Sequence, residues 1–218
     1  MLGTFEKSVK VFIKQPVLLV IPFFPAVVSL ASWLIAQSAI KGYLNNAHSG
    51  IIVTLFHFVT LFSYILFSSI LIIFIESYYK KIPFFEAFHD IYSKALEIVA
   101  ACFAISVTIE IGLKLFVLPG LVVIFFSLFI IPFMVIGKLS IMRSVRMSIY
   151  LSKKYWETVL MYAIVLIALS VIVGGIFSIL GVAGNFIATW IIYGYSASVL
   201  LNIYLLLQDK YGLFIYES

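Results

Sequence analysis

The sequence predicts an all-α integral membrane protein, built as a bundle of six transmembrane helices. Of the 218 residues, 64% are hydrophobic and only 11% are charged, whereas a soluble domain has about half apolar residues and about a quarter charged ones. In addition, six apolar segments are each long enough to cross a bilayer, which takes about 20 residues. These segments lie near residues 17–38, 51–75, 95–118, 121–137, 157–181 and 186–208.

The first apolar segment follows Lys7, Lys10 and Lys14, an order that is also found in signal peptides. The apolar core of a signal peptide, however, is only about 7 to 15 residues long. The apolar run here extends from Val17 to Ile40. We therefore expect an uncleaved transmembrane helix.

The third and fourth segments are divided by Leu118-Pro119-Gly120. Proline cannot donate the helical hydrogen bond, and glycine permits a tight reversal of the chain. A single kinked helix over residues 95–137 would be about 64 Å long, twice the hydrocarbon thickness. The sequence therefore predicts a hairpin at this point, and Pro132 predicts a kink or break in the fourth helix.

The basic residues are distributed unequally between the two ends of the predicted bundle. One end receives twelve of the fourteen lysines and arginines, and the other receives Lys41 and Lys114. Because basic residues concentrate on the cytoplasmic side, this bias predicts an inner (cytoplasmic) cell membrane protein with both termini in the cytoplasm. The same clustering beside apolar segments explains the net charge of +5 without a nucleic-acid partner, which we exclude.

An amphipathic helix lying on the membrane surface is predicted near residues 139–154. At 100° per residue its apolar side chains share one face and its basic side chains another; the basic ones are Arg143, Arg146, Lys153 and Lys154. A serine recurs every four residues between these faces, at Ser140, Ser144, Ser148 and Ser152. Small residues at this spacing allow close helix packing, although serines that merely separate the two faces would give the same pattern.

Two further stretches of mixed polarity, near residues 3–15 and 84–94, also precede predicted helical hairpins. When the three stretches are aligned, Lys14, Lys94 and Lys154 coincide. The alignment suggests an interfacial helix followed by a hairpin, repeated three times.

The sequence between Leu118-Pro119-Gly120 and Trp156 resembles a recurrent pattern of a known family. Two helices followed by Ser144, Arg146, Ser148, Leu151, Lys153 and Trp156 resemble the broad prokaryotic family of uncharacterised six-helix membrane proteins. This family includes the membrane domain attached to some glycerophosphoryl diester phosphodiesterases. Ser144 and Lys154 depart from the alanine and glycine that are usual there. The resemblance implies the six-helix topology; it implies no phosphodiesterase activity, because the catalytic domain is a separate one.

Three ionisable residues are predicted within the membrane, where each charge is costly. Glu110 and Lys114 stand four residues apart on one helix face, in the favourable order for an ion pair. They form either a structural pair, with Lys114 extended toward water, or part of a proton or ion relay. For His57, a hydrogen bond to a neighbouring helix is favoured over a metal site, because no second ligand stands at the required spacing.

No motif for enzymatic chemistry is present. The sequence lacks a phosphate-binding glycine loop, an HExxH zinc motif and a GxSxG nucleophile motif, and its one cysteine, Cys102, lies in an apolar run. We therefore expect no enzyme activity, no cofactor and no metal. Ser170, Gly174 and Ser178 have the spacing of a helix-packing face.

These observations favour a non-enzymatic membrane protein that acts as a scaffold or an envelope-maintenance subunit. Its basic cytoplasmic helices would bind anionic lipid headgroups or a partner, either another membrane protein or a second copy of the chain. The alternative is a carrier or channel for a small solute, an ion or a lipid. That alternative requires a polar path across the membrane, for which the sequence supplies few charged residues.

Overall fold

The computed structural model describes residue 6 and residues 17–38 and 46–211. The described residues contain helices and no strand, and six of the helical segments are long and apolar enough to cross a membrane. The predicted fold class is thus confirmed. The predicted surface helix near residues 3–15 lies, apart from Glu6, outside the described residues.

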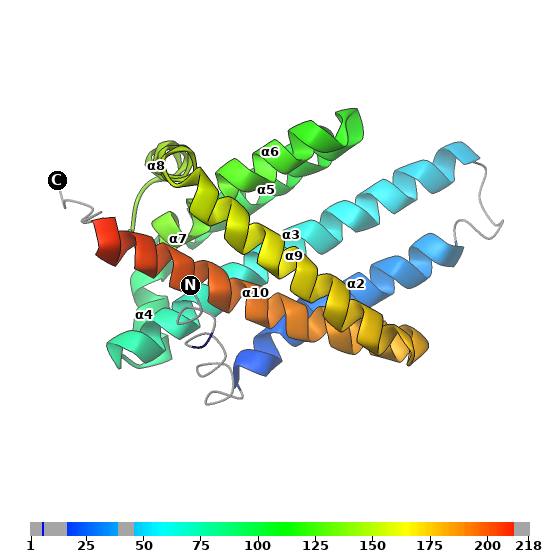
Figure 1. Cartoon of the computed structure of the whole chain (residues 1–218), viewed down its shortest axis with the longest axis horizontal. Coiled ribbons are helices and arrows are strands. Elements are labelled where there is room, and N and C mark those ends of the chain that lie inside the picture. Colours follow the sequence, from blue (N-terminus) through cyan, green and yellow to red (C-terminus); the bar gives the residue numbers. More distant parts are fainter. Residues whose placement is uncertain (1–5, 7–16, 39–45, 212–218) are drawn as a thin grey trace.

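The long helices run roughly side by side, and two short helices lie at one end of them (Figure 1). The long ones are α2 (Val17–Ser38), α3 (Asn46–Lys80), α5 (Ala95–Leu115), α9 (Trp156–Ser178), α10 (Gly181–Tyr211) and the pair formed by α6 (Val117–Ser127) and α7 (Ile130–Val135). The short ones are α4 (Phe84–Tyr92) and α8 (Ile141–Lys154). We call the end that carries α4 and α8 the basic end, and the opposite one, where α5 turns into α6, the far end.

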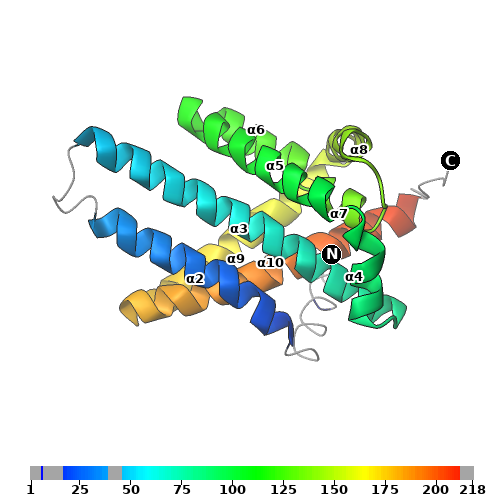
Figure 2. The same cartoon turned by 180° about the vertical axis from the view of Figure 1, so that it is seen from behind.

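Helices α3 and α10 form the centre of the bundle. α3 contacts α2, α5, α7 and α10, while α9 packs mainly on α10. α8 is seen end-on in both views, whereas the long helices lie across the picture (Figures 1 and 2). It therefore runs across the ends of the long helices, as a helix on a membrane surface would.

The hairpin between the third and fourth spans turns at Phe116, earlier than predicted. Phe116 has an extended backbone and separates α5 from α6, so Leu118-Pro119-Gly120 lies inside α6 and not between the helices. The reason is that proline is tolerated in the first turn of a helix, where its missing N–H would have no partner. Pro119 thus stands near the beginning of α6.

Two glycines allow the antiparallel helices α5 and α6 to approach closely. A Cβ atom added to Gly112 would lie 2.9 Å from the Cα of Gly120, and one added to Gly120 would lie 2.7 Å from the backbone nitrogen of Leu113. Real Cβ atoms do not approach backbone atoms so closely. The hairpin therefore depends on glycine at both positions.

The fourth span is broken as Pro132 predicts. α6 ends at Ser127, and α7 begins at Ile130. A proline has no N–H to donate to the carbonyl four residues earlier, and its ring clashes with that carbonyl. For Pro132 that residue is Leu128, which lies in the break.

The last hairpin also differs from the prediction. α9 ends at Ser178 and α10 begins at Gly181, which has a positive φ of 63°. The predicted spans 157–181 and 186–208 leave a connection up to residue 185, but residues 181–185 are the first residues of α10. As a consequence, Asn185 belongs to the wall of the bundle.

The best-packed part of the bundle lies toward the basic end. Buried apolar side chains from α3, α5, α7 and α10 pack together there, and a second cluster joins α7, α8, α9 and α10. Toward the far end, the α5–α6 hairpin diverges from α3 in both views (Figures 1 and 2). The structure is thus closed near α8 and more open at the opposite end.

Replacement of Gly112 by alanine tests the close approach of α5 and α6. Because the new methyl group would collide with the backbone of Gly120, we expect a loss of about 1–3 kcal/mol in stability, typical of overpacking. The measurement is the thermal unfolding midpoint in detergent. Gly175→Ala is the control, since a Cβ there meets nothing within 4 Å. Equal midpoints for the two variants would contradict the interpretation.

Candidate functional sites

The serine face of α8 is bonded to the break between α6 and α7. The Ser148 hydroxyl donates to the Phe126 carbonyl at 2.6 Å and accepts from the Phe129 N–H at 3.2 Å. The Ser152 hydroxyl donates to the Phe125 carbonyl at 3.1 Å. Pro132 separates α6 from α7, so backbone groups at the break lack their helical hydrogen bonds. The two serine hydroxyls bond to these backbone groups instead. Buried backbone groups need such partners.

The other two predicted serines have different surroundings. Ser144 is fully buried on the same face as Ser148 and Ser152, and its hydroxyl has no hydrogen-bond partner within the described part of the chain. Ser140 is exposed and precedes α8 as its N-cap residue, without a side-chain cap bond. The serine face therefore consists of three positions in close contact with the bundle.

The four basic residues of α8 remain on its exposed side. Lys153 lies over the ring of Phe126, with 6.0 Å from Nζ to the ring centroid. Lys154 lies 5.4 Å from the ring centroids of Tyr150 and of Tyr155. Two hydrogen bonds raise the pKa of Lys154 above its ordinary value, the larger effect coming from Tyr150 and the smaller from Tyr155. The side chain is therefore charged at neutral pH, as a lysine ordinarily is. Met142 and Trp156, both more than half exposed, lie beside these cations in the chain.

The three predicted intramembrane residues converge between α3 and α5. The Nδ1 of His57 is 2.6 Å from Oε2 of Glu110, so the predicted hydrogen bond to a neighbouring helix is present. Lys114 Nζ is 3.9 Å from Oε1 of Glu110 and also contacts the Thr54 hydroxyl. The Glu110 side chain is only 10% exposed, whereas those of His57 and Lys114 are 57% and 52% exposed.

Glu110 and Lys114 open onto a groove of about 620 Å³ between the far halves of α3 and α5. Thr54 also lines it, while its walls are otherwise apolar and include Ile51, Leu55 and Ile111. These three are more than half exposed. We call this the α3–α5 groove; it has the volume of an ordinary ligand pocket, about 300–1,000 Å³.

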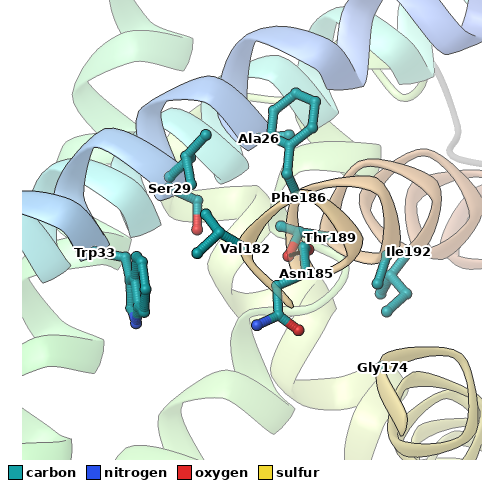
Figure 3. Close-up of a pocket in the computed structure, with 11 residues that line it drawn as sticks. Ala26, Ser29, Trp33, Gly174, Val182, Asn185, Phe186, Thr189 and Ile192 are labelled. Atoms are coloured by element: carbon teal, nitrogen blue, oxygen red, sulfur yellow. Dashed lines mark hydrogen bonds between the residues drawn. The ribbon is translucent and has the colours of Figure 1, made fainter. Parts of the chain in front are cut away.

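A second opening of about 290 Å³ lies between α2, α9 and α10 (Figure 3). Ser29 and Trp33 of α2 and Asn185 of α10 direct polar groups into the same space in Figure 3. Its lining contains no ionisable residue. Since charged ligands require compensating charges when they leave water, this opening suits an uncharged polar group.

Hydroxyl groups continue from this opening toward the middle of the bundle. Ser29 hydrogen-bonds to Tyr193, whose ring lies 4.4 Å from that of Tyr64. The Tyr64 hydroxyl is 2.6 Å from the Ser196 hydroxyl and also bonds to Ser68. This hydroxyl cluster was not predicted from the sequence; the available signal was the position of Tyr64 and Tyr193 near mid-span, because membrane tyrosines prefer the interfaces.

The predicted packing face of α9 does not make a close helix contact. A Cβ on Gly174 would meet nothing within 4 Å, and Gly174 lines the opening of Figure 3 instead. Ser170 and Ser178 bond to carbonyls of their own helix. The physical reason is that α9 leans on α10 and leaves its glycine side open.

No group of three potential metal ligands is found among residues 17–38 and 46–211, and Cys102 is buried in the core. No protein-family model matches the chain, and neither a curated protein nor a solved structure is significantly similar to it. The fold by itself defines the class, a multi-pass membrane protein with six helices able to span the bilayer.

Replacement of Ser148 by alanine tests the bonds that hold α8. The Phe126 carbonyl and the Phe129 N–H lose their partner, which costs about 1–3 kcal/mol for buried groups. We expect a lower unfolding midpoint and faster amide exchange at residues 126–130. Ser170→Ala is the control, because Ser170 bonds only within α9; its effect should stay within about 0.5 kcal/mol. If both variants behave alike, Ser148 has no special role.

Proposed function

We propose that the protein is a non-enzymatic membrane scaffold of the cytoplasmic membrane, which binds anionic lipid headgroups through the basic side of α8. The observation that carries the proposal is the attachment of α8: its serine side is bonded to the bundle, and Arg143, Arg146, Lys153 and Lys154 point away from it. A cationic surface in a fixed position is thereby presented at the basic end.

The position of the basic residues supports contact with headgroups. Each lysine or arginine near an anionic membrane surface contributes about 1 kcal/mol of attraction. Lys153 and Lys154 lie over aromatic rings, an arrangement that stabilises cations where water is partly excluded. The exposed Trp156 adds an indole ring, which favours the headgroup level.

The orientation belongs to the same proposal. Nine of the fourteen lysines and arginines lie, within the described part of the chain, at the end of α4 and α8, so the cytoplasm is the favoured side for that end and for both termini. Membership of the six-helix family suggested by the sequence pattern is likewise a proposal. It fits an accessory role, since the membrane part of that family has no assigned catalysis. A partner protein or a second copy is the other candidate occupant of the basic surface.

The double variant Arg143→Gln/Arg146→Gln tests the proposal. In titrations of the purified protein followed by native mass spectrometry, wild type should bind phosphatidylglycerol in preference to phosphatidylcholine. Loss of two charges should weaken phosphatidylglycerol binding on the order of tenfold or more. Higher salt should also reduce the preference, because exposed charges are screened.

Lys80→Gln/Lys81→Gln is the matched control. It removes the same charge at the same end, but from the end of α3, where Lys80 is paired with Glu76 at 2.6 Å. Equal losses in both double variants would mean that only net charge matters. The assignment to α8 would then be wrong.

A carrier for a small solute is the second candidate. The hydroxyl cluster favours this candidate, because it leads from the opening of Figure 3 to the middle of the bundle. Its members are Ser29, Tyr193, Tyr64 and Ser196. A carrier site is generally built from polar groups near mid-membrane. The bonds of this cluster equally serve to join α2, α3 and α10.

Thiol labelling separates the two candidates. In a Cys102→Ser background, Ser196→Cys should resist an impermeant charged thiol reagent from either side if the cluster is packed structure. Asn185→Cys, at the exposed start of α10, is the control and should react from one side. Rapid labelling at position 196 that a solute blocks would favour the carrier over the scaffold.

A further inference from the structure

The α3–α5 groove contains a buried carboxylate with one incompletely bonded oxygen. Oε2 of Glu110 bonds to His57 at 2.6 Å. Oε1 faces Lys114 at 3.9 Å, which is too long for a direct hydrogen bond. A carboxylate that is nine-tenths buried therefore retains an acceptor beside an ammonium group that is half exposed.

The groove lies near the far end of α5, with Glu110 and Lys114 within about one and a half helical turns of it. Glu110 is five residues before the end of α5 at Leu115, about 7 to 8 Å along the helix axis. A lysine near the end of a membrane helix extends its side chain to the interface, so Lys114 is expected to reach the lipid headgroups. The exposed side chains of Ile51, Leu55 and Ile111 line the groove beside Glu110 and Lys114 and form its apolar wall.

We propose that the α3–α5 groove binds an aminophospholipid of the phosphatidylethanolamine type. The lipid ammonium group donates a hydrogen bond to Oε1 of Glu110, and the lipid phosphate accepts one from Lys114. One acyl chain lies along Ile51, Leu55 and Ile111. This site is at the far end, and it does not depend on the function proposed for α8.

Charge complementarity selects this headgroup over the other common ones. Glu110 and Lys114 present one negative and one positive group 3.9 Å apart, so a headgroup with both charges close together engages both. An anionic headgroup would pair with Lys114 but would place its charge beside Glu110. A choline headgroup has the positive charge but no N–H to donate, and charged donors form the stronger hydrogen bonds.

Native mass spectrometry of the full-length protein tests this site with lipids of identical acyl chains. The probes are phosphatidylethanolamine, phosphatidylcholine and phosphatidylglycerol, and the background is the variant with Arg143, Arg146, Lys153 and Lys154 all replaced by glutamine, so that the four cations of α8 do not compete. Phosphatidylethanolamine should bind about tenfold tighter than phosphatidylcholine, the usual effect of a hydrogen bond to a charged group. In Glu110→Gln this ratio should fall to about one.

Glu76→Gln is the matched control, because Glu76 forms the same four-residue pair with Lys80 at the basic end; it should keep the wild-type ratio. Leu55→Trp is a second test that leaves the charges in place and fills the groove from a lipid-exposed position. It should reduce phosphatidylethanolamine binding without lowering the unfolding midpoint. If Glu110→Gln fails to fold, Leu55→Trp decides.

Three results would overturn the proposal. Equal binding of phosphatidylethanolamine and phosphatidylcholine to wild type would mean that the groove accepts acyl chains only. Tighter binding of phosphatidylglycerol in the α8-neutralised background would mean that Lys114 alone recognises phosphate. An unchanged headgroup preference in folded Glu110→Gln, or unchanged phosphatidylethanolamine binding in Leu55→Trp, would place the lipid elsewhere.

Discussion

The break that Pro132 introduces into the fourth span determines how α8 is held. A helix interrupted inside a bundle leaves backbone groups that must be bonded within the protein, because lipid offers no partners. Here the Ser148 and Ser152 hydroxyls supply them. A surface helix thus becomes part of the tertiary structure, and its orientation follows from the bonds of its serine side. The basic residues are exposed as a direct consequence.

The same constraint explains the difference between the two ends of the bundle. Around the break, side chains of α7, α8 and α10 form a continuous core with Phe133, Leu151 and Tyr204. Toward the far end no comparable helix crosses the bundle in the described part of the chain, and α5 and α6 are held mainly to each other through Gly112 and Gly120. The α3–α5 groove and the opening of Figure 3 both lie in this less closely packed half.

The sequence predicted the number of spans and a hydrogen bond from His57 to a neighbouring helix, but it did not predict the partner Glu110, and it misplaced the turns. Pro119 and Pro132 are each the third residue of a helix, and they differ in what precedes them. The extended backbone of Phe116 reverses the chain before α6, whereas residues 128–129 interrupt the fourth span before α7 without reversing it. For the hydroxyl cluster, the mid-span tyrosines were the available signal, but their serine partners could not be derived, because α3 and α10 are apolar on nearly all sides and no periodicity shows which serines face inward. The helix-packing role predicted for Gly174 was wrong for a different reason: the spacing of small residues does not specify which helix packs against them.

The two ends of the molecule offer different electrostatic surroundings to the membrane. At the basic end the charges are of one sign, exposed and spread over α8, so attraction to anionic headgroups is additive and tolerant of their arrangement. At the far end one carboxylate and one ammonium group are fixed 3.9 Å apart, and such a pair discriminates by geometry. Because α3 extends from the Lys80–Glu76 pair at one end to Thr54 and His57 at the other, one rigid helix connects both surfaces. Lipids bound at the two proposed sites would therefore be held at a separation set by the length of α3.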